Sequence, residues 1–216
     1  MNDSLGNRKR VLRTEMRQLR DALGNRQERS QRIWEFLDPV LRKLQRTTER
    51  TRLVNPTSME PCAASVSVDS AFRVFVFRGV GAEPGTDAWI AHMRSKGITV
   101  CLPRCEGKVM VAVDIGDDTE YHAGPFGILE PVGPAIDPTV IDAVIVPGLA
   151  FTAQGQRLGQ GGGFYDQFLP LLRNDCATIG VCFDAQLLQS VPSEHHDQLM
   201  QLVITDEGRQ GLSDWI

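Results

Sequence analysis

The sequence predicts a single α/β domain over residues 1–216, Rossmann-like, with three layers in which helices cover both faces of a mostly parallel sheet. Two patterns and the length of the chain favour this class. Short apolar runs of strand size recur between residues 73 and 205, and helical segments lie between several of them, which is the alternation typical of parallel sheets. With 216 residues, 42% of them hydrophobic, the chain is long enough to bury one sizeable core.

The N-terminal part predicts helices. Apolar side chains recur there at helical spacing, namely Leu12, Met16, Leu19 and Leu23. Gly24 follows at the kind of position where a helix commonly ends. A second apolar stripe meets Pro39, and since proline inside a helix costs about 3 kcal/mol, a break is predicted there, with Asp38 capping a new helix. We expect two to three helices over about 8–46, and then a long loop at 47–70, which is rich in Ser and Thr.

The remaining chain predicts strands that alternate with helices. The strand-sized runs are Val74–Phe77, Ile98–Leu102, Val109–Val113, Ala143–Val146, Ile179–Phe183 and Leu202–Thr205. The helical segments between them are 87–96, 164–173 and 184–189. The first of these is expected to end near Gly97.

Composition excludes several classes of protein. Charged residues make up 23% of the chain and the mean hydropathy is −0.18, so neither a disordered nor a membrane protein is expected. No apolar run approaches the ~20 residues of a membrane helix, and the N-terminus lacks the pattern of a secretory signal. We therefore expect a cytoplasmic protein without a membrane partner, and its oligomeric state stays open.

The five cysteines, at 62, 101, 105, 176 and 182, form no CxxC pair, and buried reduced thiols are the favoured interpretation.

Positive charge is concentrated at one end of the chain. Residues 1–50 hold 13 Lys or Arg against 7 Asp or Glu, although the net charge of the chain is −4. This end is suited to face phosphate, of a nucleotide or of a nucleic acid. RNA binding is disfavoured because only Trp34 and Phe36 are available there for base stacking.

The most informative segment runs from Arg157 to Asp166 and contains Gly159, Gly161, Gly162 and Gly163. Glycines allow backbone N–H groups to converge on an anion, and the helix predicted to follow adds partial positive charge at its N-terminus. Arg157 adds a full charge, and Asp166 is suited to hold Mg²⁺ against phosphate oxygens. The alternatives are a flexible glycine-rich turn, and for Asp166 a carboxylate that only offsets the helix dipole. The spacing is neither GxxxxGK[ST] nor GxGxxG, so neither standard phosphate motif is present.

In its wider context this segment resembles a known family signature. VPGLAFTAQGQRLGQGGGFYDQFL, together with RKRVLR, EPGT, VCLPRCEGK, GPFGILEP and VPSEHHD in the same order, is similar to the 5-formyltetrahydrofolate cyclo-ligase family. The resemblance implies an enzyme that uses ATP and Mg²⁺ to convert 5-formyltetrahydrofolate, a reduced folate, into 5,10-methenyltetrahydrofolate. The implied reaction phosphorylates the formyl oxygen, which is then displaced when N10 attacks.

The resemblance also implies roles for individual residues. Those that would bind ATP are Lys9, Arg10, Arg13, Arg157, Leu158, Gly159, Gln160, Gly161, Gly162, Gly163, Phe164 and Tyr165. Of these, Arg157, Gln160 and Tyr165 would act in catalysis, and the run from Gln160 to Phe164 would also contact the folate. Lys9 and Arg13 share one helical face, although a solvated basic face is the alternative.

Four further residues complete the implied site. Glu83 would accept hydrogen bonds from the pterin, and its alternative is a solvent-facing loop carboxylate. Phe126 would lie beside the folate, and its alternative is a core residue that anchors a loop. Asp166 and Asp197 would bind Mg²⁺.

Two residues depart from the family pattern. Gln160 stands where the signature usually has a second arginine, and Gln201 stands where Asp is frequent. Gln160 loses the charge-assisted part of a phosphate contact, and Gln201 is expected to weaken the arrangement near Asp197. These departures support an alternative function, a catalytically weak relative that binds a nucleotide or a reduced folate as a regulatory or accessory protein.

Overall fold

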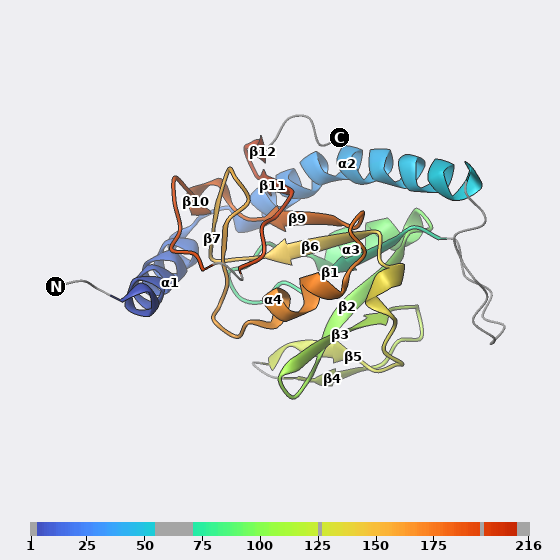
Figure 1. Cartoon of the computed structure of the whole chain (residues 1–216), viewed down its shortest axis with the longest axis horizontal. Coiled ribbons are helices and arrows are strands. Elements are labelled where there is room, and N and C mark those ends of the chain that lie inside the picture. Colours follow the sequence, from blue (N-terminus) through green and yellow to red (C-terminus); the bar gives the residue numbers. More distant parts are fainter. Residues whose placement is uncertain (1–3, 55–70, 125–126, 195–196, 211–216) are drawn as a thin grey trace.

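The computed structural model describes residues 4–54, 71–124, 127–194 and 197–210. Its centre is a seven-stranded sheet in the order β12-β11-β9-β6-β1-β2-β3 (Figure 1). The strands are β1 (Arg73–Val76), β2 (Thr99–Glu106), β3 (Val109–Asp114), β6 (Ala143–Pro147), β9 (Ala177–Val181), β11 (Leu202–Thr205) and β12 (Gly208–Gln210). The five central strands are parallel, and β3 and β12 pair antiparallel at the two edges. The predicted α/β class is confirmed, with a mixed, mostly parallel sheet.

Helices cover both faces of this sheet. The side chains of β1 alternate, so Val74 and Val76 pack on one face while Phe75 packs on the other. Helices α2 (Arg26–Val54) and α3 (Asp87–Ser95) lie on the first face, where the rings of Trp34 and Trp89 stack at 4.9 Å. The short helix α4 (Phe164–Phe168) and the 3-10 turn Leu169–Leu171 cover the second face.

The predicted break at Pro39 is wrong, because α2 continues through this proline to Val54. Leu37, Val40 and Leu41 are all buried in the same core, and burying such side chains contributes about 1.5–3 kcal/mol each, which offsets the cost of the proline. Asp38 does not cap a new helix, since its carboxylate accepts a hydrogen bond from Trp89 Nε1 at 3.0 Å.

The loop predicted at 47–70 is likewise wrong over 47–54, which belong to α2. The rest of that loop, 55–70, lies outside the described residues. Helix α3 confirms the prediction over 87–96 within one residue.

Two other predicted helices are shorter than expected. The segment 164–173 holds only α4 and a 3-10 turn that contains Pro170, and Leu171 is 52% exposed. The segment 184–189 is a 3-10 turn followed by the two-residue strand β10 (Leu187–Leu188). The buried side chain of Gln186 bonds to Phe183 N and to the carbonyls of Gly148 and Leu149, which ties this turn to the segment after β6.

Several short strands were not predicted. The pair β7 (Ala150–Thr152) and β8 (Arg157–Leu158) forms a hairpin, and β10 pairs with β7 beside it. The pair β4 (Tyr121–Ala123) and β5 (Leu129–Pro131) forms a second small sheet. Strands of two or three residues are too short to show a period of two. The β7–β8 hairpin matters for the site because it fixes the backbone of Arg157.

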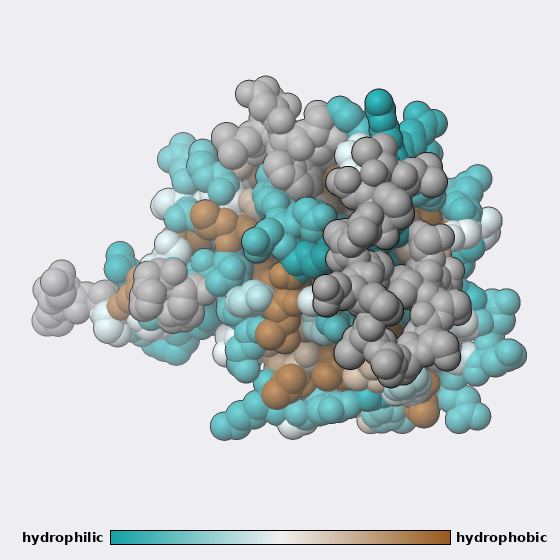
Figure 2. Space-filling model, turned by 45° about the vertical axis from the view of Figure 1, so that its right-hand side comes forward, coloured by the Kyte–Doolittle hydropathy of each residue, from teal (hydrophilic) through white to brown (hydrophobic). Residues whose placement is uncertain are grey.

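Helix α1 (Leu5–Ala22) confirms the first predicted helix. Its buried residue Met16 packs against Leu149 and Leu158, so α1 lies on the β7–β8 sheet and not on the central one. Among the described residues, no helix is long and apolar enough to cross a membrane. Hydrophilic residues cover much of the surface seen in Figure 2, with apolar residues gathered in a band near its centre.

The cysteine prediction is confirmed for three of the five residues. Cys101, Cys176 and Cys182 are buried free thiols, and Cys105 is half-buried. Burial raises the pKa of each thiol above its ordinary value. Cys62 lies outside the described residues.

Candidate functional site

A cavity of about 690 Å³ lies between α1, the glycine loop and strands β2, β3 and β5. It brings together segments that are far apart in the sequence, including residues 9–17, 77–83, 103–110, 128–130 and 157–166. A volume of this size is typical of a binding site for a small organic ligand. Helix α1 contributes the basic residues Lys9, Arg13 and Arg17 to the lining, whereas β2 and β3 contribute Pro103, Cys105 and Met110.

The glycine loop takes a backbone conformation that explains its composition. Gly161 has φ +107° and Gly163 has φ +70°, in the left-handed region that side chains disfavour. A Cβ at Gly161 would lie 3.5 Å from the guanidinium carbon of Arg13, which is an ordinary contact distance, so the positive φ and not crowding favours glycine there. Helix α4 begins directly after Gly163 but has only five residues. Its contribution of positive charge is therefore smaller than that of a longer helix, and side-chain charges gain importance.

Arg157 is one of the residues that line the cavity. It lies on β8, its side chain is 6% exposed, and its Nη2 donates to Asp166 Oδ1 on α4 at 2.8 Å. The guanidinium carbon also lies 5.4 Å from the ring centre of Tyr165. The Arg157 Nε is buried and has no partner among the described residues. The two residues that flank the glycines in sequence thus form one ion pair on the cavity wall.

Helix α1 presents a basic face to the glycine loop. Lys9, Arg13 and Arg17 follow one another at intervals of four, which places them on one side of the helix. Lys9 is buried and its Nζ donates to Asp197 Oδ2 and to Glu194 Oε2, both at 2.8 Å. Burial lowers the pKa of Lys9, but the hydrogen bonds and charges of the two carboxylates outweigh this, so the pKa is raised and the amine stays charged.

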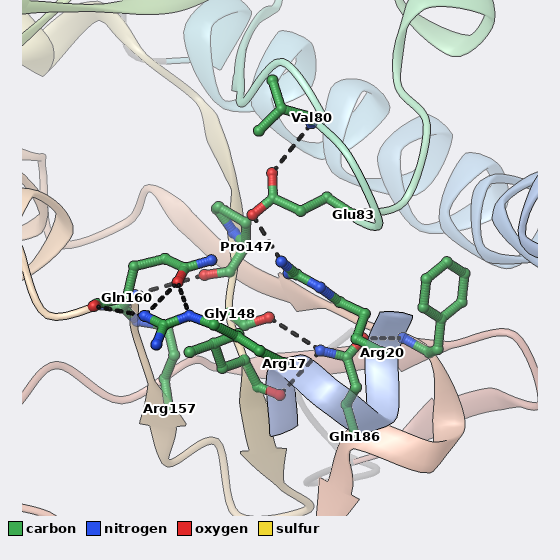
Figure 3. A network of polar contacts seen from close by, with 11 residues as sticks. Arg17, Arg20, Val80, Glu83, Pro147, Gly148, Arg157, Gln160 and Gln186 are labelled. Carbon is green, nitrogen blue, oxygen red and sulfur yellow. Dashed lines mark hydrogen bonds and ion pairs between the residues drawn. The ribbon is translucent and has the colours of Figure 1, made fainter. Parts of the chain in front are cut away.

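Two arginines of α1 bind the loop through oxygen atoms that carry no net charge. Arg13 Nε donates to the carbonyl of Gly159 at 3.0 Å, and Arg17 donates to the side-chain and backbone oxygens of Gln160 (Figure 3). Neither arginine has a carboxylate partner among the described residues. We call Arg13, Arg17 and the loop 159–163 the cationic rim.

The other side of the cavity is mostly apolar but contains isolated polar groups. We call it the inner wall and define it by Phe77, Pro103, Cys105, Met110, Ile128, Glu130 and Tyr165. The Tyr165 hydroxyl and Glu130 Oε2 are both buried and have no hydrogen-bond partner among the described residues. Burial raises the pKa of Tyr165, so its hydroxyl keeps its proton. Burial and the neighbouring Glu130 raise the pKa of Cys105 to about 11, so its thiol is neutral at pH 7.

Glu83 lies where the cavity meets α1. One of its carboxylate oxygens accepts from Arg20 Nη1 at 3.4 Å, and the other accepts from Val80 N at 3.3 Å (Figure 3). Both ion-pair partners are largely buried, with side chains 8% and 11% exposed for Arg20 and Glu83. The carboxylate is therefore fixed in place beside the cavity and not left free in solvent, contrary to the alternative considered from the sequence.

Most predicted site residues line this one cavity. They are Lys9, Arg13, Glu83, Asp166, Asp197 and the whole run from Arg157 to Tyr165. Arg10 does not line it, since this exposed side chain bonds to Asn7 Oδ1. Phe126 lies outside the described residues. Gln201 binds Thr178 at the start of β9 and lines a separate surface pocket, so it is not part of the arrangement around Asp197.

Several lining residues were not predicted from the sequence. Arg17 continues the spacing of Lys9 and Arg13 by one more step, a signal that was available. Glu130 and Cys105 gave no such signal, because only the pairing of β2 with β3 and the neighbouring β5 bring them to the inner wall.

The carboxylates of the cavity suit a Mg²⁺ ion that phosphate oxygens help to hold. No group of three or more His, Cys, Asp or Glu side chains in the described part of the chain forms a metal site by itself. Asp166 and Asp197 both line the cavity, and each now bonds to a cation, Arg157 or Lys9. Mg²⁺ commonly binds through one or two carboxylates together with water and substrate phosphates, so this donor set fits.

The sheet, the cationic rim and the inner wall define an α/β protein whose large cavity suits a ligand with a polyanionic part and an apolar part. Comparison with known proteins narrows this class. Residues 6–206 match the model of the 5-formyltetrahydrofolate cyclo-ligase family, and the chain belongs to this family. The family predicted from the sequence is thus confirmed.

Individual relatives agree with this assignment. The chain is 34% identical over 147 residues to a 5-formyltetrahydrofolate cyclo-ligase of Mycolicibacterium smegmatis, which covers 63% of this chain and 74% of that protein. It is 32% identical over 97 residues to a 5-formyltetrahydrofolate cyclo-ligase of Saccharomyces cerevisiae, covering 39% of this chain and 43% of that one. Its fold is similar to the NMR structure of Aquifex aeolicus 5,10-methenyltetrahydrofolate synthetase, with a TM-score of 0.74, 23% identity, and coverage of 96% and 94%.

Proposed function

We propose that this protein closes 5-formyltetrahydrofolate to 5,10-methenyltetrahydrofolate, with ATP converted to ADP and phosphate. Membership of the family supports a ligase that acts on a folate in one-carbon metabolism. The observation that carries the proposal is the cavity itself, which joins a cationic rim to an apolar inner wall with buried polar groups. A triphosphate and a reduced pterin need these two environments side by side.

The cationic rim is the proposed phosphate site. Arg13 supplies charge from the rim, Arg157 supplies charge from β8 beside it, and the glycines between 159 and 163 line the cavity. Arginine can hold phosphate oxygens through two parallel hydrogen bonds, which fixes geometry as well as charge. Lys9 is proposed to contribute charge, although its amine is already bound by Asp197 and Glu194.

The inner wall and Glu83 are the proposed folate site. The pterin ring carries amino and ring N–H donors, and the fixed Glu83 carboxylate is an acceptor for them. Phe77, Met110 and Ile128 offer apolar surface for the ring. Phe126 remains a candidate for stacking by the family resemblance.

The reaction then follows from the chemistry of the formyl group. Its oxygen is amide-like and is a poor leaving group until it carries phosphate. The oxygen attacks the γ-phosphorus, and the bond from that phosphorus to ADP breaks. N10 next attacks the formyl carbon and loses its proton, and the carbon–oxygen bond breaks to release phosphate that contains the former formyl oxygen. The protein acts mainly by positioning the reactants and neutralising charge.

Three side chains are proposed to act on the reacting groups. Arg157, whose Nε has no partner among the described residues, can stabilise charge on the transferred phosphoryl oxygens. Tyr165 stays protonated because burial raises its pKa, so it can donate a hydrogen bond but not act as a base. The Gln160 side-chain oxygen is already occupied by Arg17, which leaves its NH₂ group to donate.

Magnesium is proposed as the second cofactor. Asp166 and Asp197 would hold the ion, which would neutralise charge on the phosphate oxygens. Their present partners, Arg157 and Lys9, would then be available to bind the same phosphates.

The test is an absorbance assay of the purified protein with 5-formyltetrahydrofolate, ATP and Mg²⁺, in which the methenyl product is followed. We expect product only when all three are present. Saturable binding of ATP without product would contradict the proposal and would support the alternative of a catalytically weak, nucleotide-binding relative.

A further inference from the structure

We propose that Arg17, held in place by Gln160, binds a phosphate group of ATP and supplies the charge that the family signature usually places on the glycine loop. The inference rests on the proposed ATP site and adds to it a residue that the family resemblance did not indicate. Gln160 replaces the second arginine of the signature, and Arg17 is the guanidinium that lies against it in the structure.

The contacts between these two side chains are specific. Arg17 Nε and Nη2 donate to Gln160 Oε1 at 3.2 and 3.0 Å, and Nη2 also donates to the Gln160 backbone oxygen at 3.4 Å (Figure 3). These bonds fix the guanidinium beside the loop while it still lines the cavity. Its Nη1 has no hydrogen-bond partner among the described residues, so it remains able to donate.

The charges around the cavity single out Arg17. The other cations that line it include Lys9, Arg78 and Arg157, and each of these forms an ion pair with a carboxylate. Among the described residues, Arg13 and Arg17 form no such pair, and both bond to neutral oxygens of the loop. Two adjacent guanidinium groups without a counter-charge favour an anion between or beside them.

The packing of α1 makes this position rigid. Met16, the neighbour of Arg17 in sequence, is 3% exposed and packs against Leu149 and Leu158. Leu158 directly precedes the glycine loop, so the helix and the loop are fixed relative to each other. Arg17 therefore reaches the loop from a held backbone, which lowers the entropy lost when it binds a phosphate.

Glutamine is a suitable residue at position 160 for this arrangement. Its side-chain oxygen accepts hydrogen bonds from Arg17, whereas a guanidinium there would meet a like charge. The departure from the signature and the position of Arg17 are thus explained together. The positive charge that the signature places on the loop is kept beside the loop, but Arg17 of α1 supplies it.

The test is a cycle of four proteins: the wild type, Arg17→Ala, Gln160→Arg and the double variant. ATP affinity is measured by calorimetric titration, and the KM for the folate and the melting temperature are measured alongside. Arg17→Ala should weaken ATP binding about fivefold to tenfold, since tenfold corresponds to about 1.4 kcal/mol. Gln160→Arg alone should give no gain in ATP affinity over the wild type. In the Arg17→Ala background, it should restore most of the ATP affinity that Arg17→Ala loses. Arg8→Ala, an exposed arginine of α1 outside the cavity lining, is the control for net charge and should leave ATP affinity unchanged.

The outcomes separate this inference from the proposed function. If the wild type does not bind ATP, the proposed function fails. If it binds ATP and Arg17→Ala binds equally well, the inference is overturned and the proposed function stands. Equal losses of ATP and folate affinity with a lowered melting temperature would also overturn it, because they would show that Arg17 only holds the loop.

Discussion

The two sides of the cavity differ in how their polar groups are satisfied. On the cationic rim, Arg13 and Arg17 bond to neutral oxygens of the loop and keep their charge uncompensated by any carboxylate of the described chain. On the inner wall, the Tyr165 hydroxyl and Glu130 Oε2 are removed from solvent and have no hydrogen-bond partner among the described residues, although Glu130 Oε2 lies 3.8 Å from His122 Nε2. The rim thus offers excess charge to an anion, and the wall offers unsatisfied hydrogen bonds to a ring.

This difference predicts different contributions to binding. Charge near the surface acts over about 10 Å at 0.1 M salt and is screened as salt rises. A buried polar group without a partner costs about 1–3 kcal/mol, and a ligand that supplies the partner recovers this energy only if its shape fits. The rim should therefore govern affinity for ATP, and the wall should govern selectivity for the folate.

The largest effect is expected where the two sides meet, at Asp166. We predict that Asp166→Asn lowers Mg²⁺-dependent kcat by about hundredfold or more, because charge stabilisation by a metal is worth several kcal/mol and about 1.36 kcal/mol is tenfold in rate. The amide can still accept the hydrogen bond from Arg157, so the melting temperature should change little. Asp175→Asn, at an exposed carboxylate that pairs with Arg173, is the control. A large loss of stability with kcat retained would show a structural role for Asp166.

A smaller loss of turnover, together with a gain in stability, is expected on the inner wall. Tyr165→Phe removes a buried hydroxyl that has no partner among the described residues, so the free protein should become more stable, with a rise in melting temperature of about 2–4 °C per kcal/mol recovered. Turnover should fall about tenfold, as the ligand loses one hydrogen bond. Tyr121→Phe, at the other and exposed tyrosine, should change neither quantity. A lower melting temperature with normal turnover would mean that the hydroxyl serves the fold alone.

The rim should respond to substitution and to salt together. We predict that Arg13→Ala raises the KM for ATP about fivefold to tenfold and leaves the KM for the folate nearly unchanged. The KM for ATP of the wild type should also rise with KCl, and less steeply in the variant. Lys9→Ala is less informative, since it would leave Asp197 and Glu194 without the amine that now binds both. Equal changes in both KM values would contradict a separate phosphate side.

The sequence predicted the rim better than the wall, for physical reasons. The glycines of the loop lie close together in the chain, and their chemistry is readable without knowing the fold. Glu130 and Cys105 reach the inner wall only through the pairing of β2 with β3 and the neighbouring β5. Pro39 misled the helix prediction because local propensity ignores the buried side chains on either side of it. The helical spacing of Lys9 and Arg13 pointed to Arg17, but its contact with Gln160, 143 residues away, could be seen only in the structure.

The most direct test of the proposed chemistry follows one oxygen atom. 5-Formyltetrahydrofolate labelled with ¹⁸O in the formyl group is converted with ATP and Mg²⁺, and the released phosphate is analysed by mass spectrometry. If the cavity brings the formyl oxygen to the γ-phosphorus, one ¹⁸O atom appears in phosphate for each methenyl product formed. Unlabelled phosphate, with the label found in water, would contradict phosphorylation of the formyl group and with it the roles proposed for Arg157, Gln160 and Tyr165.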